Sequence, residues 1–169
     1  TFDNILIATF PVADVLALLW LVWVMNMINW SKGIDGQMPS IVSVAAIILG
    51  ILSIKLYLGG DPQQAIIAKL AFITAGSALG FLVVNWYPAK IFPGFSASTM
   101  FGLLIAVLAI LSGAKLATAG LALLVPATDF IYTFLRRIIQ GKSPVWGDRG
   151  HLHHMLLDLG LSHQQIALF

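Results

Sequence analysis

The chain has 169 residues, of which 59% are hydrophobic and only 9% are charged. Because soluble domains carry about 25% charged residues, this composition excludes an ordinary soluble domain and favours a membrane protein. The net charge of +2 provides no basic surface large enough for nucleic acid, and the absence of cysteine excludes disulfides and thiolate metal sites.

Five apolar stretches approach the roughly 20 residues that a membrane-spanning helix needs. In chain order they are Val12–Ile28, Ile41–Leu58, Ala65–Val84, Ser98–Leu111 and Ala114–Leu135. The residues before Val12 are interpreted as the exit of an earlier span or as a loop at the membrane surface. We therefore expect an all-α fold, a polytopic transmembrane helical bundle of about five spans, with residues 1–169 forming one integral-membrane domain.

The connections between these stretches alternate between short and long. Gly59–Gln64 and Ser112–Lys115 read as tight turns, and the second predicts that the fourth and fifth spans form an antiparallel hairpin. With five spans, the longer connections at 29–40 and 85–97 and the segment after Leu135 must lie together on the opposite face.

Basic residues favour the face with the long connections. That face carries six Lys and Arg residues, whereas the other carries three. Because basic residues favour the cytoplasmic side of a membrane, we expect a multi-pass protein of the plasma (inner) membrane with its polar loops in the cytoplasm. Residues 136–169 are expected to form a cytoplasmic, His-rich loop and the segment that follows it.

The segment Asn26–Gly36 follows the first span and is rich in polar groups. Asn26 and Asn29 are three residues apart and share one face of the helix end, and Asp35 lies between two glycines. A carboxylate facing amides suits Mg²⁺ or a sugar nucleotide. A helix C-cap followed by a turn explains the same residues equally well.

The segment Gly80–Ser98 has Asn85 at a helix exit and Lys90 in the loop that follows. Trp86 and Tyr87 fit an aromatic belt at the membrane surface. A loop anchored at the interface explains the segment apart from Asn85 and Lys90.

Asp129 lies inside the expected fifth span, six residues before its end. An acidic residue at that depth is a functional-site hypothesis by default. Arg136 lies seven residues further on and shares the same helix face, so a buried ion pair that orients the helix explains Asp129 nearly as well.

A polar cluster follows the last apolar stretch. Within seven residues the chain places Asp148, Arg149, His151, His153 and His154. Histidine serves as a metal ligand, an anion donor or a proton carrier, although this spacing does not match a familiar zinc site. The alternative is a solvated loop at the membrane surface.

Four segments resemble motifs of the polyprenyl-phosphate N-acetylhexosamine-1-phosphate transferases, a family of integral membrane enzymes. NMINWSKGIDG resembles N-x-x-N-x-x-D-G-x-D-G, and GFLVVNWYPAKIFPGFSAS resembles G-F-L-x-x-N-x-x-P-A-x-I-F-x-G-D-x-G-S. PATDFIYTFLRR resembles P-x-x-D-x-x-x-x-x-x-R-R, and GKSPVWGDRGHLHHMLLDLGLSHQQ resembles the His-rich cytoplasmic loop of the family. The resemblance covers essentially the whole chain and implies the C-terminal half of a family member.

The resemblance implies a reaction and its partners. The family moves N-acetylhexosamine 1-phosphate from a UDP-sugar donor onto a membrane polyprenyl (undecaprenyl) phosphate and releases UMP, in the synthesis of cell-wall and envelope glycans. Mg²⁺ is the implied cofactor, with Mn²⁺ as an alternative. The form DRGHLHH is more similar to members that use simple UDP-N-acetylhexosamines, and a homodimer is compatible with the assignment.

The motif positions imply roles for individual residues. Asp35 and Asn29 are expected to be catalytic, and Asp35 is also the expected metal ligand. The expected substrate-binding residues are Asn26, Asn85, Lys32, Asp148, Arg149, His151, His153 and His154.

Three positions depart from the motifs. Lys32 and Phe95 stand where the motifs have Asp, and Ala97 replaces a Gly. Phe cannot ligate a hard cation and Lys repels one. Two hypotheses follow: a transferase in which Lys32 takes over part of the charge compensation at the phosphates, or a catalytically degenerate member that binds polyprenyl phosphate or a UDP-sugar without turnover.

Overall fold

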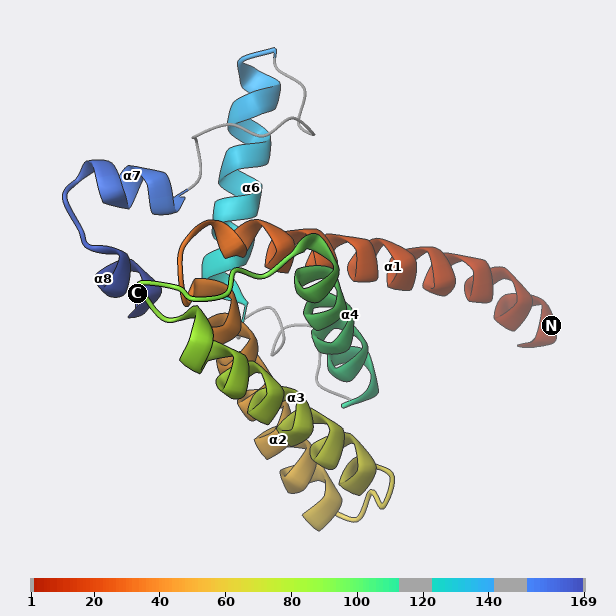
Figure 1. Ribbon diagram of the computed structural model, residues 1–169. Helices are drawn as coiled ribbons and strands as arrows, with labels where there is room; N and C mark the ends of the chain where they lie inside the picture. Colours follow the sequence, from red (N-terminus) through yellow and green to blue (C-terminus); the bar gives the residue numbers. More distant parts are fainter. Residues whose placement is uncertain (1, 113–122, 142–151, 169) are drawn as a thin grey trace.

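The described part of the chain is helical throughout, apart from turns and connections. The computed structural model describes residues 2–112, 123–141 and 152–168. Its elements are α1 (Phe2–Trp30), the 3-10 helix η1 (Ser31–Gly33), α2 (Gln37–Leu58), α3 (Gln64–Asn85), α4 (Phe95–Leu111), α6 (Leu124–Ile139), α7 (Leu152–Asp158) and α8 (His163–Leu168). This confirms the all-α prediction (Figure 1).

Three helices of the described residues are long and apolar enough to cross a membrane. They cover Pro11–Gly33, Gln37–Leu58 and Gln64–Asn85, and α4 is a shorter apolar helix. The expected interfacial loop or earlier exit before Val12 is wrong, because the residues from Phe2 onward continue the first helix through Pro11. The chain is therefore part of a multi-pass helical membrane protein.

The expected fifth span differs from the structure. Its first part and the turn Ser112–Lys115 lie largely outside the described residues. The part that is described, α6, begins at Leu124 and continues past Leu135 to Ile139, so both Arg136 and Arg137 belong to the helix. Both arginines lie in the last turn of α6, a few residues past the expected end of the span. Helix α6 extends away from the α2–α3 hairpin (Figure 1).

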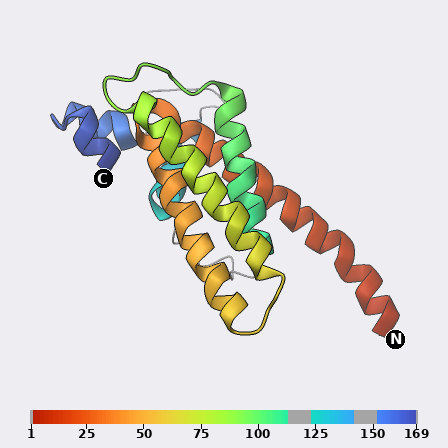
Figure 2. The same ribbon diagram turned by 60° about the horizontal axis from the view of Figure 1, so that its bottom comes forward.

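Helices α2 and α3 form an antiparallel hairpin and lie side by side along their lengths (Figure 2). A tight turn joins them, in which Gly60 has a φ of +103° and Asp61 Oδ1 accepts a hydrogen bond from the Gln63 N–H at 3.1 Å. The facing surfaces carry small residues, which allow helix backbones to approach closely within a membrane. A Cβ on Gly50 would lie only 2.9 Å from the Phe72 ring.

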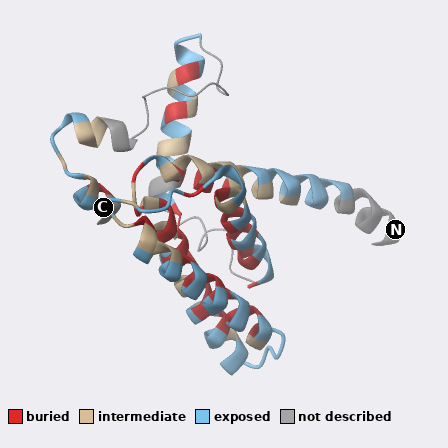
Figure 3. Cartoon of the chain, viewed as in Figure 1, coloured by how far each residue is buried: buried red, intermediate tan, exposed pale blue. Residues whose placement is uncertain are grey.

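Helix α1 crosses α4 at a second close contact. A Cβ on Gly102 would lie 2.7 Å from Met25 Cα, so only glycine fits there without movement of a neighbour. The Trp20 indole N–H donates a hydrogen bond to the Ala106 carbonyl at 3.2 Å in the same crossing. Buried side chains from α1, α2, α3 and α4 meet in one core, whereas α1 is largely exposed between residues 11 and 19 (Figure 3).

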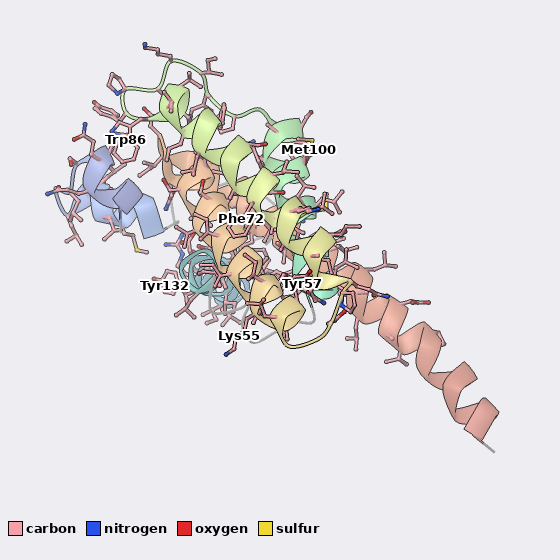
Figure 4. All side chains as sticks on the ribbon, turned by 90° about the horizontal axis from the view of Figure 1, so that it is seen from below. Lys55, Tyr57, Phe72, Trp86, Met100 and Tyr132 are labelled. Atoms are coloured by element: carbon pink, nitrogen blue, oxygen red, sulfur yellow. The ribbon has the colours of Figure 1, made fainter. Side chains whose placement is uncertain are left out.

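The connections collect at two ends of this bundle. Trp86 and Lys55 mark opposite ends of the α2–α3 hairpin (Figure 4). At the Lys55 end, Gln64 Nε2 donates to the Leu111 carbonyl at 3.4 Å, which joins the start of α3 to the end of α4. At the Trp86 end lie the end of α1, the start of α2, the end of α3 and the start of α4. The predicted meeting of the 29–40 and 85–97 connections is therefore confirmed.

Candidate functional site

The candidate site lies at the Trp86 end of the bundle, where two connections are tied together by polar side chains. Asn85 is 1% exposed and is the central member of this group. Its Oδ1 accepts a hydrogen bond from the Gly36 N–H at 3.0 Å, and its Nδ2 donates to the Ile91 carbonyl at 2.9 Å. The amide thus satisfies one backbone group in each connection.

Asp35 forms a second link between the same connections. Its Oδ2 accepts a hydrogen bond from the Ala89 N–H at 3.0 Å. The neighbouring Gly36 has a φ of +79°, and a Cβ there would lie 3.1 Å from the Trp86 ring. Glycine is needed both for the left-handed backbone and for the close approach of this ring.

Asn29 links the end of α1 to the first turn of α4. Its Oδ1 lies 2.7 Å from the Ser98 hydroxyl, which donates to it. Ser98 is fully buried, and its hydroxyl also lies within hydrogen-bond distance of the Gly94 and Phe95 carbonyls. Asn29 is therefore not a helix C-cap, which was the alternative reading of the sequence, but a contact between distant helices.

Lys32 and Phe95 contact each other across the site. The Lys32 ammonium lies 5.6 Å from the centre of the Phe95 ring, within the range of a cation–π interaction. Lys32 is half-buried, whereas Phe95 is 66% exposed. The two positions at which the chain departs from the acidic motif positions are thus direct neighbours.

Asn26 lies apart from this hydrogen-bonded group. Its Nδ2 donates to the Val22 carbonyl of its own helix at 2.8 Å. It lines an apolar groove of about 430 Å³ between α1 and α6, whose other lining residues are Leu19, Val22, Trp23, Trp30, Phe130 and Phe134. The groove leads along α1 to Trp30, two residues before Lys32.

Aromatic contacts fix α6 against the end of α1. Trp30 stacks on Phe130 with ring centres 4.8 Å apart, and the Arg137 guanidinium lies 5.7 Å from the centre of the Trp30 ring. Arg137 is 2% exposed, so its charge is buried beside the groove. Asp129 lines a separate hollow of about 220 Å³ with Thr128, Tyr132 and the α7 residue Met155.

The histidine cluster lies mostly beyond the described part of the chain. Asp148, Arg149 and His151 lie outside the described residues, and His153 and His154 lie in α7, where only the backbone is described. Their expected roles stay predictions. The fourth histidine, His163 at the start of α8, stacks on Tyr87 with ring centres 4.8 Å apart and brings α8 to the site.

Sequence reasoning missed several of these contacts. Ser98 was read as the start of a span, Tyr87 as an anchor at the membrane surface, and His163 was given no role. Their partners are Asn29, which is 69 residues away from Ser98, and residues of other helices. Only the motif that contains Ser98 could have indicated its importance. Local periodicity does not reveal a hydrogen-bond partner so far away in the chain.

The described residues do not form a magnesium site by themselves. Mg²⁺ needs oxygen ligands in octahedral geometry, and among the described residues no three His or Asp side chains come together. The Asn29 and Asn85 oxygens and one Asp35 oxygen accept protein hydrogen bonds, and the ammonium of Lys32 repels a cation. The residues present do not fit the implied metal.

Residues 1–113 match the model of Glycosyl transferase family 4. The decaprenyl-phosphate N-acetylglucosaminephosphotransferase of Mycolicibacterium smegmatis is 33% identical over 90% of the chain and 42% of its own length. The probable undecaprenyl-phosphate N-acetylglucosaminyl 1-phosphate transferase of Bacillus subtilis is 32% identical over 90% of the chain and 43% of its own length.

A relative with a different sugar in its name matches a shorter region. The phospho-N-acetylmuramoyl-pentapeptide-transferase of Levilactobacillus brevis is 38% identical over 57% of the chain and 28% of its own length. The fold and the site together define the class: a helical membrane protein whose polar loops meet at one end of the bundle. The chain belongs to Glycosyl transferase family 4, and it spans less than half the length of these relatives.

Proposed function

We propose that the protein transfers N-acetylhexosamine 1-phosphate from a UDP-sugar to a membrane polyprenyl phosphate and releases UMP. The observation that carries the proposal is the continuity between an apolar groove and a polar site. Trp30 lines the groove between α1 and α6, and in the chain it lies directly after Asn29 and shortly before Lys32 and Asp35.

This arrangement suits an acceptor that is a lipid with a phosphate head. The aromatic and aliphatic walls of the groove favour an isoprenoid chain, because burying apolar surface is favourable. The phosphate of such a lipid would then lie beside the polar residues at the end of α1. The names of the relatives, each a transferase and two of them acting on polyprenyl phosphates, support the same reaction.

Transfer between two phosphates requires that negative charge be neutralised and that the donor be held in line. Lys32 would supply positive charge at the mouth of the site, and the cluster Asp148–His154 would contact the nucleotide-sugar. In the proposed orientation both lie in the cytoplasm, where UDP-sugars are dissolved.

The test uses the whole protein in nanodiscs with undecaprenyl phosphate and UDP-N-acetylglucosamine. The proposal predicts release of UMP together with formation of a sugar-diphosphate lipid. UDP-glucose, which lacks the acetamido group, is the matched donor control. Trp23→Ala in the groove should raise KM for the polyprenyl phosphate by about tenfold, given that an aromatic side chain buries a large apolar area, and should leave KM for the donor unchanged.

A second candidate is a family member that binds its ligands without turnover. The contact between Lys32 and Phe95, which stand at two acidic motif positions, favours it. The two candidates differ in one measurement: a non-catalytic member releases no UMP at any concentration of Mg²⁺ or Mn²⁺ but still binds undecaprenyl phosphate.

A further inference from the structure

We propose that Lys32, positioned by the Phe95 ring, is a phosphate-binding residue that takes the place of a divalent cation, so that the nucleotide diphosphate of the donor binds here without metal. The inference rests on the proposed function for the identity of the donor. It concerns how the same site neutralises the charge of that donor.

Lys32 and Phe95, the two residues that stand at acidic motif positions, are paired in space. Lys32 is in η1 and Phe95 opens α4, yet the ammonium lies 5.6 Å from the ring centre. An ammonium and an aromatic ring at this distance attract each other through the ring quadrupole. The two departures from the motif therefore form one interacting pair.

The second step is the charge at this place. Two carboxylates with one divalent cation sum to zero, whereas Lys32 with Phe95 carries a charge of +1. Among the described residues the ammonium of Lys32 faces the uncharged Phe95 ring, and Asp35 accepts the Ala89 N–H. In the proposed site the positive charge of the ammonium acts on a ligand anion.

The third step is the position of the ammonium. Phe95 is 66% exposed, so the pair lies at the open surface of the site rather than in the core. A long lysine side chain loses rotamer freedom when it binds an anion. The ring holds the ammonium near one position in advance, so less of that freedom remains to be lost on binding.

The fourth step is the set of oxygen ligands around the pair. Asn29 accepts from Ser98, Asn85 accepts from Gly36, and Asp35 accepts from Ala89. These bonds hold the loops together, and each of these three oxygens already accepts a hydrogen bond from the protein. A magnesium ion needs several oxygen ligands around it, whereas an ammonium donates its own three hydrogens to phosphate oxygens and needs no protein ligands.

Isothermal titration of UDP-N-acetylglucosamine into the whole protein, in nanodiscs of neutral phosphatidylcholine, tests the inference. Affinity in EDTA should equal affinity in Mg²⁺ within about threefold, a difference well below the 1.4 kcal/mol of a tenfold change. Lys32→Met should weaken binding by about 10- to 100-fold, the range of a hydrogen bond to a charged group, and Lys32→Arg should retain most of it.

Two further variants separate the roles of the partners. Phe95→Leu keeps an apolar side chain but removes the ring, and should weaken donor binding less than Lys32→Met. Lys90→Met, in the exposed loop at the same end, is the matched control and should bind like the unchanged protein. Lys32→Asp combined with Phe95→Asp should make donor binding depend on Mg²⁺.

Donor binding that disappears in EDTA would overturn the inference, as would equal affinity in the Lys32→Met and Lys90→Met variants. A double Asp variant that binds as well in EDTA as the unchanged protein would also contradict it. UMP release is measured on the same samples and tests the proposed transfer separately. Donor binding that requires Mg²⁺ together with UMP release overturns the inference and keeps the transfer, whereas metal-free donor binding without UMP release does the reverse.

Discussion

Asn85 joins the two connections of the site through one buried side chain, with Gly36 on one side and Ile91 on the other. Neither bond belongs to a helix, so the relative position of the loops depends on side-chain amide geometry rather than on secondary structure.

Asn85→Ala should lower the free energy of unfolding by about 1–3 kcal/mol, because it leaves the buried Gly36 N–H without its acceptor and removes the donor of the part-buried Ile91 carbonyl. Denaturant titration in mixed micelles measures the change. Asn26→Ala is the matched control: it removes an amide that bonds only to its own helix in an exposed position, and should lower the free energy by less than about 1 kcal/mol. Equal losses in the two variants would show that the Asn85 bonds do not hold the loops.

Gly36→Ala should also destabilise the protein. A residue other than glycine in the left-handed region costs about 1–2 kcal/mol, and the new Cβ would press on the Trp86 ring at 3.1 Å. Gly80→Ala is the control, because no atom lies within 4 Å of its Cβ position and Ala favours a helix by up to about 1 kcal/mol. The thermal midpoint should fall in the first variant and stay level or rise in the second.

At the crossing of α1 and α4, a glycine in close contact and a glycine in open space should again differ in their tolerance of alanine. A Cβ on Gly102 would lie 2.7 Å from Met25 Cα, a backbone atom that moves only with its helix. Gly102→Ala should therefore lower the free energy of unfolding by about 1–3 kcal/mol, the range for an overpacked core. Gly76→Ala, at a position with open space around its Cβ, should leave the free energy of unfolding unchanged. A Gly102→Ala protein of unchanged stability would show that the helices can separate freely.

Tyr87→Ala should loosen α8. The stack of Tyr87 on His163 contributes about 0.5–1.5 kcal/mol, so amide hydrogen exchange in α8 should rise by about 2- to 10-fold. The Ile166 N–H, which donates to the Ser162 carbonyl, is a suitable probe. Tyr57→Ala at the other end of the α2–α3 hairpin is the control. Unaltered exchange in α8 after Tyr87→Ala would mean that other contacts hold it.

The helices and the meeting of the loops could be predicted because they depend on local signals. Long apolar runs define α1, α2 and α3, and Gly60 with Asp61 and Pro62 defines the turn that reverses the chain. Once the directions of the spans are known, alternation alone places the first two long connections at one end. No tertiary information is needed for that step.

The contacts that build the site could not be predicted in the same way. Lys32 and Phe95 were recognised as departures from a motif, but their contact depends on how α4 starts relative to η1. Arg137 lies in the last turn of α6, where a basic residue is common, but the Trp30 ring that lies over its guanidinium comes from another helix. Nothing in the local sequence indicates that this arginine is buried.

The hydrogen bond between Trp20 and Ala106 also bears on the order in which the protein is made. Its acceptor lies 86 residues after its donor. At roughly 5–20 residues per second, the ribosome adds Ala106 about 4–17 s after Trp20. During that interval α1 must remain in the bilayer without α4, while the α2–α3 hairpin, with its short turn, can close at once. The bundle is thus expected to assemble from its hairpin outward, with the crossing of α1 and α4 completed last among these four helices.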